Sequence, residues 1–303
     1  MLIKKIQEFD ICHFVSGYYI MYKIPDLFDY CVSKIHNKIP IVTRWSGGNY
    51  RWLFPIRKTI KKKSLQRCNQ IICSGKDETT TLQTVFKIPK NNIKFLMNPI
   101  DLTKFKKRDK VEISTKLKLD PKFDYLLFVG RLVKSKGIEN ILLVFSEIQK
   151  KLNNTKLIII GNGPLSIEIN ENIKKNNLEE SVFLKEHMSH DEICFYYNIA
   201  TVLINTGMSG GLPNVVIEAI ASKLPVIATN VGATKDFINS DTGILIGIND
   251  QQALKLAIID ILTTNKKFNQ TKQNIFEQFS YENFGKKLVE IYKNANLSFN
   301  NEE

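Results

Sequence analysis

The chain has few cysteines and histidines, and none is spaced as metal ligands would be. The five cysteines are odd in number and form no closely spaced pairs of the kind that bind zinc, and the four histidines add no such pattern. We therefore expect reduced, buried thiols, a cytoplasmic compartment and no metal centre. The cysteines in question are Cys12, Cys31, Cys68, Cys73 and Cys194.

Long apolar segments are also absent. No apolar run approaches the length needed to cross a bilayer, and the N-terminal stretch carries Lys4, Lys5, Glu8 and Asp10 instead of a signal-peptide core. No internal repeat is visible, and no nucleic-acid-binding motif accompanies the basic residues. We expect a cytoplasmic protein that lies on the inner face of the membrane if it contacts one, and no nucleic-acid partner.

The composition is that of a globular protein with an excess of positive charge. Hydrophobic residues make up 43% of the 303 residues and charged residues 24%, which excludes a disordered chain, a collagen and a coiled-coil rod. The net charge is +13, and the excess is confined to residues 1–110, which hold 22 Lys and Arg against 8 Asp and Glu. This asymmetry predicts a domain boundary near residue 110 and an anionic partner for the first domain.

Short apolar strands alternate with amphipathic helical stretches along the chain, which predicts an α/β fold with parallel sheets. We predict two Rossmann-like doubly wound domains, at 1–110 and 111–280, followed by a C-terminal helix and tail at 281–303. Ligand loops are expected where the strands end. The predicted strands are 11–15, 39–45, 70–74 and 93–97, then 125–129, 156–160, 182–184, 202–205, 225–228 and 242–246.

A basic glycine loop follows the strand predicted at 125–129. Residues 130–137 read Gly-Arg-Leu-Val-Lys-Ser-Lys-Gly and precede a helix, so their backbone N–H groups are placed to bind an anion. Arg131 can add a forked contact and Lys136 a point charge for a diphosphate. Taken alone, such a loop is more typical of a solvated basic turn.

The most informative stretch is 209–219, Ser-Gly-Gly-Leu-Pro-Asn-Val-Val-Ile-Glu-Ala. Its two glycines permit close approach of a ligand, and Pro213 suits the first turn of a helix. Glu218 then lies early in that helix, where its carboxylate can accept hydrogen bonds from vicinal hydroxyls such as those of a ribose. The alternative is that Glu218 sits on a solvated helix face.

Together with Gly161-Asn162-Gly163-Pro164, the 224–228 strand and Asp241-Thr242-Gly243, these motifs occur in a familiar order. The chain resembles the family 4 glycosyltransferases, the retaining "glycosyl transferases group 1" with the GT-B fold, from about residue 90 to 265. The resemblance implies an enzyme of the EC 2.4 class that takes a nucleotide-sugar as donor, with 111–280 binding that donor and 1–110 lying on the acceptor side.

The resemblance also implies residue roles. Arg131 and Lys136 would bind the diphosphate and stabilise it as it leaves, and Glu218 would hold the ribose. Members of the family need no metal, and this chain has no Asp-x-Asp motif to hold one, so no cofactor beyond the donor substrate is expected. The remaining donor-binding positions would be Gly130, Gly163, His187 beside the nucleobase, Gly210, Gly211, Leu212 and Pro213.

Two departures from the family pattern affect these expectations. The family usually places a second glutamate eight positions before the one matched by Glu218, and Gly210 stands there. The chain also starts just before a segment that several βα units precede in the family. We therefore expect either a shortened N-terminal domain or a fragment or split gene product. These departures fit several alternatives. The protein could use a different sugar or belong to a variant subfamily. It could also be a weakly active or inactive relative that binds a nucleotide-sugar or a partner subunit.

Two groups of residues in the first domain are candidates for other contacts. His13 near the end of a strand, and Gly47 and Gly48 in a strand-to-loop turn, are acceptor-side candidates, although a lone histidine or a glycine turn is also common for structural reasons. Residues 51–67 mix basic and apolar side chains, which suits contact with anionic lipid as well as a solvated helix face. The membrane candidates are Trp52, Arg57, Lys58, Lys61, Lys62 and Lys63.

The sequence therefore predicts a metal-independent retaining glycosyltransferase. The acceptor would be a lipid-linked group or a saccharide, used in the synthesis of cell-surface polysaccharide or glycoconjugate. Its partners would be the nucleotide-sugar, that acceptor and the cytoplasmic membrane surface. A nucleotide-sugar epimerase on the same fold is disfavoured, because the motifs lack suitable acid and base side chains.

Overall fold

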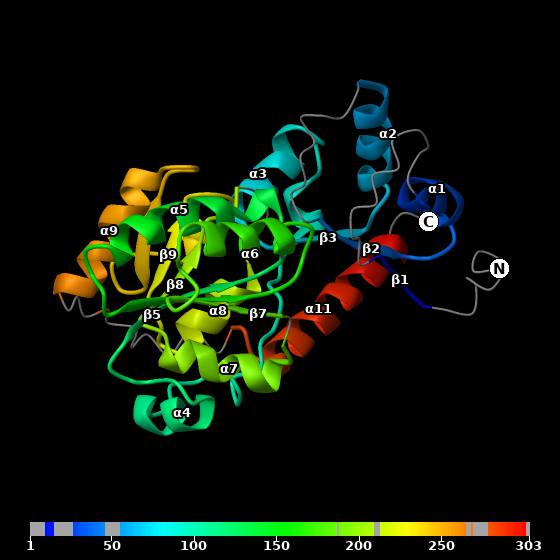
Figure 1. The fold of residues 1–303 in the computed structure, drawn as a ribbon. Helices are drawn as coiled ribbons and strands as arrows, with labels where there is room; N and C mark the ends of the chain where they lie inside the picture. The colour runs from blue at the N-terminus through cyan, green and yellow to red at the C-terminus, as the bar shows by residue number, and fades with distance from the viewer. Residues whose placement is uncertain are drawn as a thin grey trace. The chain divides into compact units, whose positions relative to one another are not determined.

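A computed structural model describes residues 10–14, 27–45, 55–186, 188–208, 213–264, 268 and 278–300, without the side chains of Leu27 and Arg57. The chain forms two compact units: residues 1–99 with 281–303, and residues 100–280 (Figure 1). Both are built on parallel sheets, so the predicted α/β class with two Rossmann-like units is confirmed. Among the described residues, no helix is both long and apolar enough to span a bilayer.

The first unit has a four-stranded parallel sheet in the order β1-β2-β3-β4. Short β-branched runs such as Ile41–Arg44 form its strands, and apolar side chains from α1, α2 and α3 pack with Ile41 and Ile71 on one face. The strands are β1 (Cys12–Phe14), β2 (Ile41–Arg44), β3 (Gln70–Cys73) and β4 (Ile93–Phe95), and the helices are α1 (Leu27–Ile35), α2 (Pro55–Gln66), α3 (Lys76–Thr84) and α11 (Tyr281–Asn300).

The helix α11 completes the first unit from the far end of the sequence. Its buried Ile291 and Ala295 form a cluster with Val42 of β2, Ile72 of β3 and Leu96, the residue after β4. The sequence prediction treated 281–303 as a segment by itself. The structure differs because the second face of this sheet is apolar and α11 covers it.

The boundary between the units also differs from the predicted one, at residues 99/100 instead of 110/111. The side chain of Phe105 is only 2% exposed and lies against Tyr197 of the second unit. Asn198 accepts a hydrogen bond from the backbone N–H of Arg108 at 2.7 Å and donates one to the carbonyl of Lys106 at 3.0 Å. The basic segment thus packs on the second unit, and its charge does not mark the boundary.

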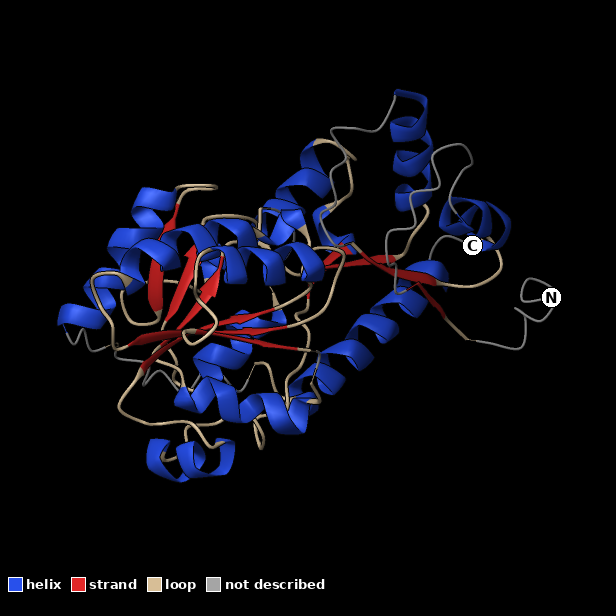
Figure 2. Ribbon diagram, viewed as in Figure 1, coloured by secondary structure: helices blue, strands red, loops and turns tan. Residues whose placement is uncertain are grey.

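The second unit is a six-stranded parallel sheet in the order β10-β9-β8-β5-β6-β7 (Figure 2). Helices α5, α6 and α9 cover one face, and α7 and α8 cover the other (Figure 1). The strands are β5 (Asp124–Val129), β6 (Thr155–Ile160), β7 (Val182–Lys185), β8 (Val202–Asn205), β9 (Val226–Thr229) and β10 (Gly243–Ile246), and the helices are α4 (Lys110–Leu117), α5 (Ile138–Gln149), α6 (Ser166–Lys175), α7 (His190–Ile199), α8 (Asn214–Ala221) and α9 (Gln251–Thr264).

This strand order reverses direction between β5 and β8. The chain runs from β5 outward to β6 and β7, then returns to β8 on the other side of β5 and continues to β9 and β10. The loops that follow β5 and β8 therefore leave the same edge of the sheet toward opposite faces. In doubly wound sheets this is the place where ligands bind, and the loop at 130–137, which follows β5, lies there. Of the motif at 209–219, the structure describes residues 213–219, which form the start of α8 after β8.

Candidate active site

The loop after β5 positions two cations at the start of α5. It contains a short 3-10 turn, Lys134–Lys136, and ends at Gly137, which has a left-handed φ of 67° and caps α5. A Cβ atom at Gly137 would lie 2.7 Å from the carbonyl oxygen of Thr206. Only glycine fits there without strain, because both the backbone angle and the approach of the next loop exclude a side chain.

Three of the predicted corners meet at this edge through backbone contacts. The hydroxyl of Thr206 donates to the carbonyl of Lys136 at 2.8 Å, and the N–H of Met208 donates to the carbonyl of Ser135 at 2.9 Å, so the loops after β5 and β8 are joined. On the other side, the N–H of Leu132 donates to the carbonyl of Asn162 at 3.0 Å. The sheet topology thus brings together motifs far apart in the sequence.

The predicted donor-binding Gly163 has a local structural explanation. A Cβ atom there would lie 2.4 Å from the carbonyl oxygen of Leu132, so this glycine lets the loop after β6 pack against the loop after β5. Gly130 is the first residue after β5, and its N–H donates to the carbonyl of Ile160 at 3.0 Å. Both glycines therefore shape the loop that carries the two cations.

Arg131 and Lys136 are close enough to affect each other electrostatically. Burial lowers the pKa of Lys136, and the neighbouring guanidinium of Arg131 lowers it further. Arg131 is exposed and Lys136 half-buried. Within the described part of the chain, neither forms a salt bridge with a carboxylate. A partly desolvated pair of like charges at a helix start favours binding of a multiply charged anion.

Glu218 is buried, so its interpretation as a residue on a solvated helix face is wrong. Its side chain is 5% exposed, and the hydroxyl of Tyr197 donates a hydrogen bond of 2.7 Å to its Oε2 atom. Burial raises the pKa of Glu218, whereas the Tyr197 hydrogen bond and His190 lower it. Pro213 stands immediately before α8 as its N-cap residue, in an extended conformation.

The helix α7, which follows β7, contacts this glutamate through Tyr197. α7 begins at His190 with a capping box formed by Ser189 and Glu192, and the charge of His190 acts on Glu218. The first residue of α7 is thus close enough to Glu218, the residue predicted to hold the ribose, to act on its pKa. The other predicted donor residues, His187, Gly210, Gly211 and Leu212, lie outside the described residues.

In the first unit, His13 packs against the C-terminal helix. It is the central residue of β1, and its Nδ1 atom lies 2.8 Å from the hydroxyl of Tyr292 on α11. Its Nε2 atom is buried and has no hydrogen-bond partner in the parts the structure describes. Burial, and then the charge of Arg44, lower the pKa of His13. The other acceptor-side candidates, Gly47 and Gly48, lie outside the described residues.

Three side chains of these two sites were not singled out as individual site residues by the sequence. Tyr197 and Tyr292 occupy helix positions that are typical of core aromatics, so no motif marks them. Arg44 ends β2 and donates to the carbonyl of Leu96 at 2.5 Å, while burial lowers its pKa. For Arg44, the sequence offered one signal of a site residue, namely a cation at the carboxyl end of a buried strand.

The predicted membrane-contact residues on α2 divide into two groups. Lys58 and Lys63 are exposed, Lys62 is half-buried, and Ile56 is 76% exposed. The Nζ atom of Lys61 instead lies 3.0 Å from the Oδ1 atom of Asp29 on α1. Its ammonium is also 4.7 Å from the ring centre of Phe28, so Lys61 joins two helices. Trp52 and the side chain of Arg57 lie outside the described residues.

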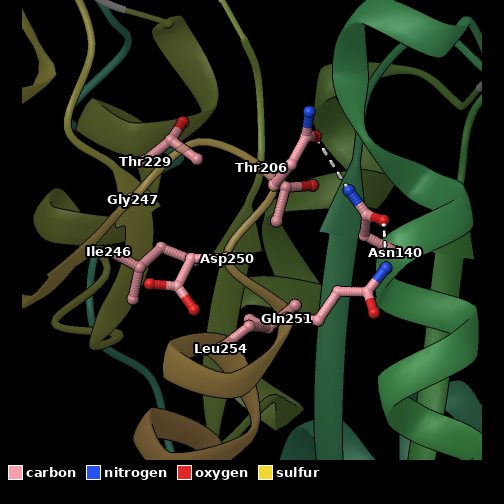
Figure 3. A pocket seen from close by; sticks show the side chains of 9 residues that line it. Asn140, Thr206, Thr229, Ile246, Gly247, Asp250, Gln251 and Leu254 are labelled. Atoms are coloured by element: carbon pink, nitrogen blue, oxygen red, sulfur yellow. Dashed lines mark hydrogen bonds between the residues drawn. The ribbon is translucent and has the colours of Figure 1, made fainter.

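A small polar hollow lies between the first turns of α5 and α9 (Figure 3). Its amide side chains bond one another: Asn140 donates to Asn249 at 3.0 Å, and Gln251 donates to Asn140 at 2.8 Å. Asp250 accepts from the N–H of Ala253 and so caps α9. These bonds tie the two helices together. Among the described residues there is no group of three or more His, Cys, Asp or Glu placed to hold a metal.

Comparison with known proteins connects this site to one family. The family described as "Glycosyl transferases group 1" matches residues 109–278. Similar curated proteins include a glycosyltransferase of Methanocaldococcus jannaschii named as uncharacterized, 23% identical over 75% of this chain and 60% of its own length. The alpha-monoglucosyldiacylglycerol synthase of Streptococcus pneumoniae is 27% identical over 66% of this chain and 47% of its own length.

A third relative, the capsular polysaccharide biosynthesis glycosyltransferase CapM of Staphylococcus aureus, is 32% identical over 58% of this chain and 49% of its own length. The matched region thus spans about half to three-fifths of these relatives. Among solved structures, Anabaena HepE in complex with UDP has a TM-score of 0.80 at 14% identity, covering 95% of this chain and 80% of that one. A glycosyltransferase of Rickettsia africae has a TM-score of 0.78 at 19% identity, covering 97% and 80%. These structures share the fold.

Proposed function

Because the chain belongs to the glycosyl transferases group 1, we propose that it transfers a sugar from a nucleotide-sugar to an acceptor used in cell-surface polysaccharide or glycoconjugate synthesis. The acceptor would be a lipid-linked group or a saccharide. The names of two relatives, a glucosyldiacylglycerol synthase and a capsular polysaccharide glycosyltransferase, support both acceptor classes. UDP bound in a protein of the same fold supports a nucleotide donor.

The observation that carries the proposal is the pair Arg131 and Lys136 at the switch point of the second sheet. Departure of the nucleoside diphosphate leaves negative charge on its outer phosphate. Two fixed cations and the amide groups at the start of α5 stabilise that charge as it develops. Glu218 lies near the loop after β7, where it would accept hydrogen bonds from the ribose hydroxyls.

We infer a retaining reaction that needs no metal or other cofactor. Arg131 and Lys136 supply the positive charge that a divalent cation supplies in other sugar transfers. The bond from the anomeric carbon to the diphosphate breaks, the diphosphate leaves, and the acceptor hydroxyl bonds to that carbon from the same face, giving up its proton. The configuration of the product, read by proton NMR at the anomeric position, tests retention. Transfer that persists in excess chelator supports the absence of a metal, and loss of transfer that Mg²⁺ or Mn²⁺ restores would contradict it.

The donor site is tested first by binding. UDP-, GDP- and ADP-sugars are screened for an increase in melting temperature, because a ligand that binds only the folded chain stabilises it. We expect one nucleotide class to raise the melting temperature. No shift with any of them would contradict the donor site. Binding without detectable transfer would favour the alternative, a weak or inactive relative, for which Gly210 in place of the usual glutamate is the specific reason.

The roles of the two cations are tested by substitution. Arg131→Ala with Lys136→Ala should reduce transfer by about 10²- to 10³-fold, the usual loss when charge stabilisation of a leaving group is removed. Lys134→Ala is the matched control, because Lys134 is an exposed lysine of the same 3-10 turn. Unchanged turnover in the double variant, or an equal loss in the control, would overturn the assignment.

We further propose that the protein acts at the inner surface of the cytoplasmic membrane, with α2 facing anionic lipid, and that it has no nucleic-acid partner. Exposed Lys58 and Lys63 beside an exposed Ile56 support this proposal. Lysines near an anionic bilayer each contribute about 1 kcal/mol, and an isoleucine side chain can enter the interface.

A further inference from the structure

We propose that Tyr197 is a positioning residue for the nucleotide: its hydroxyl fixes the carboxylate of Glu218 in the orientation that accepts hydrogen bonds from ribose hydroxyls. This inference rests on the proposed function, because it requires a nucleotide in the site. Neither the resemblance to the family nor the motifs that carry it assign any role to Tyr197.

The contact is short and shielded from water. Tyr197 is 1% exposed and Glu218 5% exposed, and the phenol hydroxyl lies 2.7 Å from the Oε2 atom of Glu218. A carboxylate on an otherwise free side chain has several rotamers, whereas one held through one oxygen keeps its second oxygen in a fixed direction. Ordering the acceptor before the ligand arrives reduces the entropy lost on binding.

Tyr197 is itself fixed by parts of the second unit that carry no ligand motif. Its ring meets the ring of Phe105 edge to face, with ring centres 5.7 Å apart. The next residue, Asn198, bonds to the backbone at Lys106 and Arg108. The segment 100–109 therefore supports α7 from outside the nucleotide loops, and α7 in turn holds the glutamate on α8.

The electrostatic surroundings give the hydroxyl a second effect. The groups that act on the pKa of Glu218 are Tyr197 and His190, both from α7, and α8 carries no other ionisable side chain. Burial raises the pKa of Glu218, and the Tyr197 hydrogen bond is the larger of the two opposing influences. Removing the hydroxyl therefore raises the pKa of Glu218 further, and the carboxyl group is protonated at a higher pH.

The test is Tyr197→Phe in the full chain, with nucleotide binding measured by titration calorimetry. The ligand is whichever of UDP, GDP and ADP binds best, together with its 2′,3′-dideoxy form. We expect the variant to bind the ribonucleotide roughly three- to tenfold more weakly, the effect of one net hydrogen bond. The dideoxy form, which lacks the hydroxyls that Glu218 holds, should bind both proteins equally. Across a pH series, the acid-side loss of ribonucleotide affinity should begin at a higher pH in the variant.

Two further variants separate positioning from loss of stability. Tyr125→Phe removes a comparable hydrogen bond, because the hydroxyl of this 1%-exposed tyrosine donates to the carbonyl of Asp120 near the opposite end of the strand β5. It should lose similar stability and keep full affinity. In a Glu218→Ala background, Tyr197→Phe should weaken binding no further, because the side chain through which it acts is gone.

The outcomes distinguish the two proposals. If the parent protein binds no nucleoside diphosphate, the proposed function fails and the role of Tyr197 fails with it. If the parent protein binds and Tyr197→Phe binds the ribonucleotide equally well, only the role of Tyr197 is overturned. An equal loss for the ribonucleotide and the dideoxy form, or an equal loss in Tyr125→Phe, likewise overturns positioning.

Discussion

Gly137 shows how closely the loops of the candidate site pack. Its left-handed φ of 67° and the 2.7 Å that would separate a Cβ atom from the carbonyl oxygen of Thr206 exclude any other residue. Gly137→Ala should therefore lower the free energy of unfolding by about 2–4 kcal/mol, from the left-handed backbone and the steric overlap together. Urea denaturation followed by circular dichroism measures the change.

Gly285 provides the matched control for this substitution. It lies inside α11, and no atom comes within 4 Å of where its Cβ would be. Gly285→Ala should raise the free energy of unfolding by about 0.5–1 kcal/mol, because alanine is the better helix former. Similar effects of the two substitutions would mean that the packing of Gly137 against Thr206 is not as described.

Glu218 links the proposed donor site to stability through its burial. Its pKa is raised above the ordinary value of 4.5, so the stabilisation from the protonated form is complete below that value and is lost as pH rises through the folded pKa. Glu218→Gln cannot ionise. Its stability relative to the parent should therefore increase between pH 4.5 and pH 8, while its nucleotide affinity falls.

Urea melts of the parent and Glu218→Gln proteins across this pH range measure the effect. Glu147→Gln is a suitable comparison, because this exposed glutamate bonds Lys255 and its pKa is lowered instead of raised. The stability of Glu147→Gln relative to the parent should not increase as the pH rises. A difference for Glu218→Gln that stays constant with pH would contradict the raised pKa of Glu218.

Sequence reasoning predicts candidate site residues when a backbone motif carries them, and misses neighbours that only packing brings to them. Arg131 and Lys136 follow from a glycine loop between a strand and a helix, and the structure places them at the switch point. The burial of Glu218 depends on α7, which comes from another part of the chain. Tyr197 has no local signal at all, because an aromatic residue inside a helix is usually a core residue.

At the scale of elements, α2 shows that a cluster of basic residues need not act as one surface. Lys61 pairs with Asp29 and lies over the ring of Phe28, so it contributes to packing between α1 and α2. Lys58 and Lys63 extend into solvent, with Lys62 between these extremes. The helical periodicity of a basic run predicts which residues share a face. It does not predict whether an acidic residue of another helix packs against that face.

The proposed membrane contact of α2 predicts a specific loss of lipid binding. Replacing Lys58, Lys62 and Lys63 by Gln should weaken binding to vesicles containing anionic phospholipid on the order of 100-fold, at about 1 kcal/mol per lysine. Sedimentation at low salt with vesicles that contain anionic phosphatidylglycerol is a direct measurement, because screening by salt weakens the attraction. Vesicles of phosphatidylcholine alone should bind neither protein.

Two controls limit this prediction to α2. The first replaces Lys150, Lys174 and Lys175, three exposed lysines of the second unit, and should leave vesicle binding nearly unchanged. The second, Lys61→Gln, should lower stability through loss of the contact with Asp29 while vesicle binding is kept. Equal losses in both triple variants would mean that net charge, and not α2, governs binding.

At the scale of the whole molecule, the pattern of strands predicted the two parallel sheets. The charge composition predicted the boundary between the two units at the wrong residue. The six strands of the second sheet lie where apolar runs predicted them, since a buried parallel strand must be apolar on both faces. The predicted boundary at 110/111 lies too late in the chain, and the observed one is at 99/100. The reason is that the basic residues at 104–110 pack within the second unit. Charge reports on the surface, whereas a unit is defined by what it buries.

The first unit depends on a helix from the other end of the chain, which leads to a prediction about cooperativity. Ile291 of α11 is 4% exposed and packs with Val42, Ile72 and Leu96. Ile291→Ala should lower the free energy of unfolding of this unit by about 2–5 kcal/mol, the usual range for a buried isoleucine. In hydrogen exchange, amide protection should fall in β2 and β3, although more than 200 residues separate them from the substitution.

Val289→Ala is the control, because this valine lies on the same helix with its side chain 51% exposed. It should change the stability by less than about 0.5 kcal/mol, as surface substitutions usually do. Protection of β5 and β6 should be alike in the parent and both variants, since those strands are buried in the core of the second unit. If Ile291→Ala lowered protection in β5 and β6 as much as in β2 and β3, the division into a first unit closed by α11 and a separate second unit would be wrong.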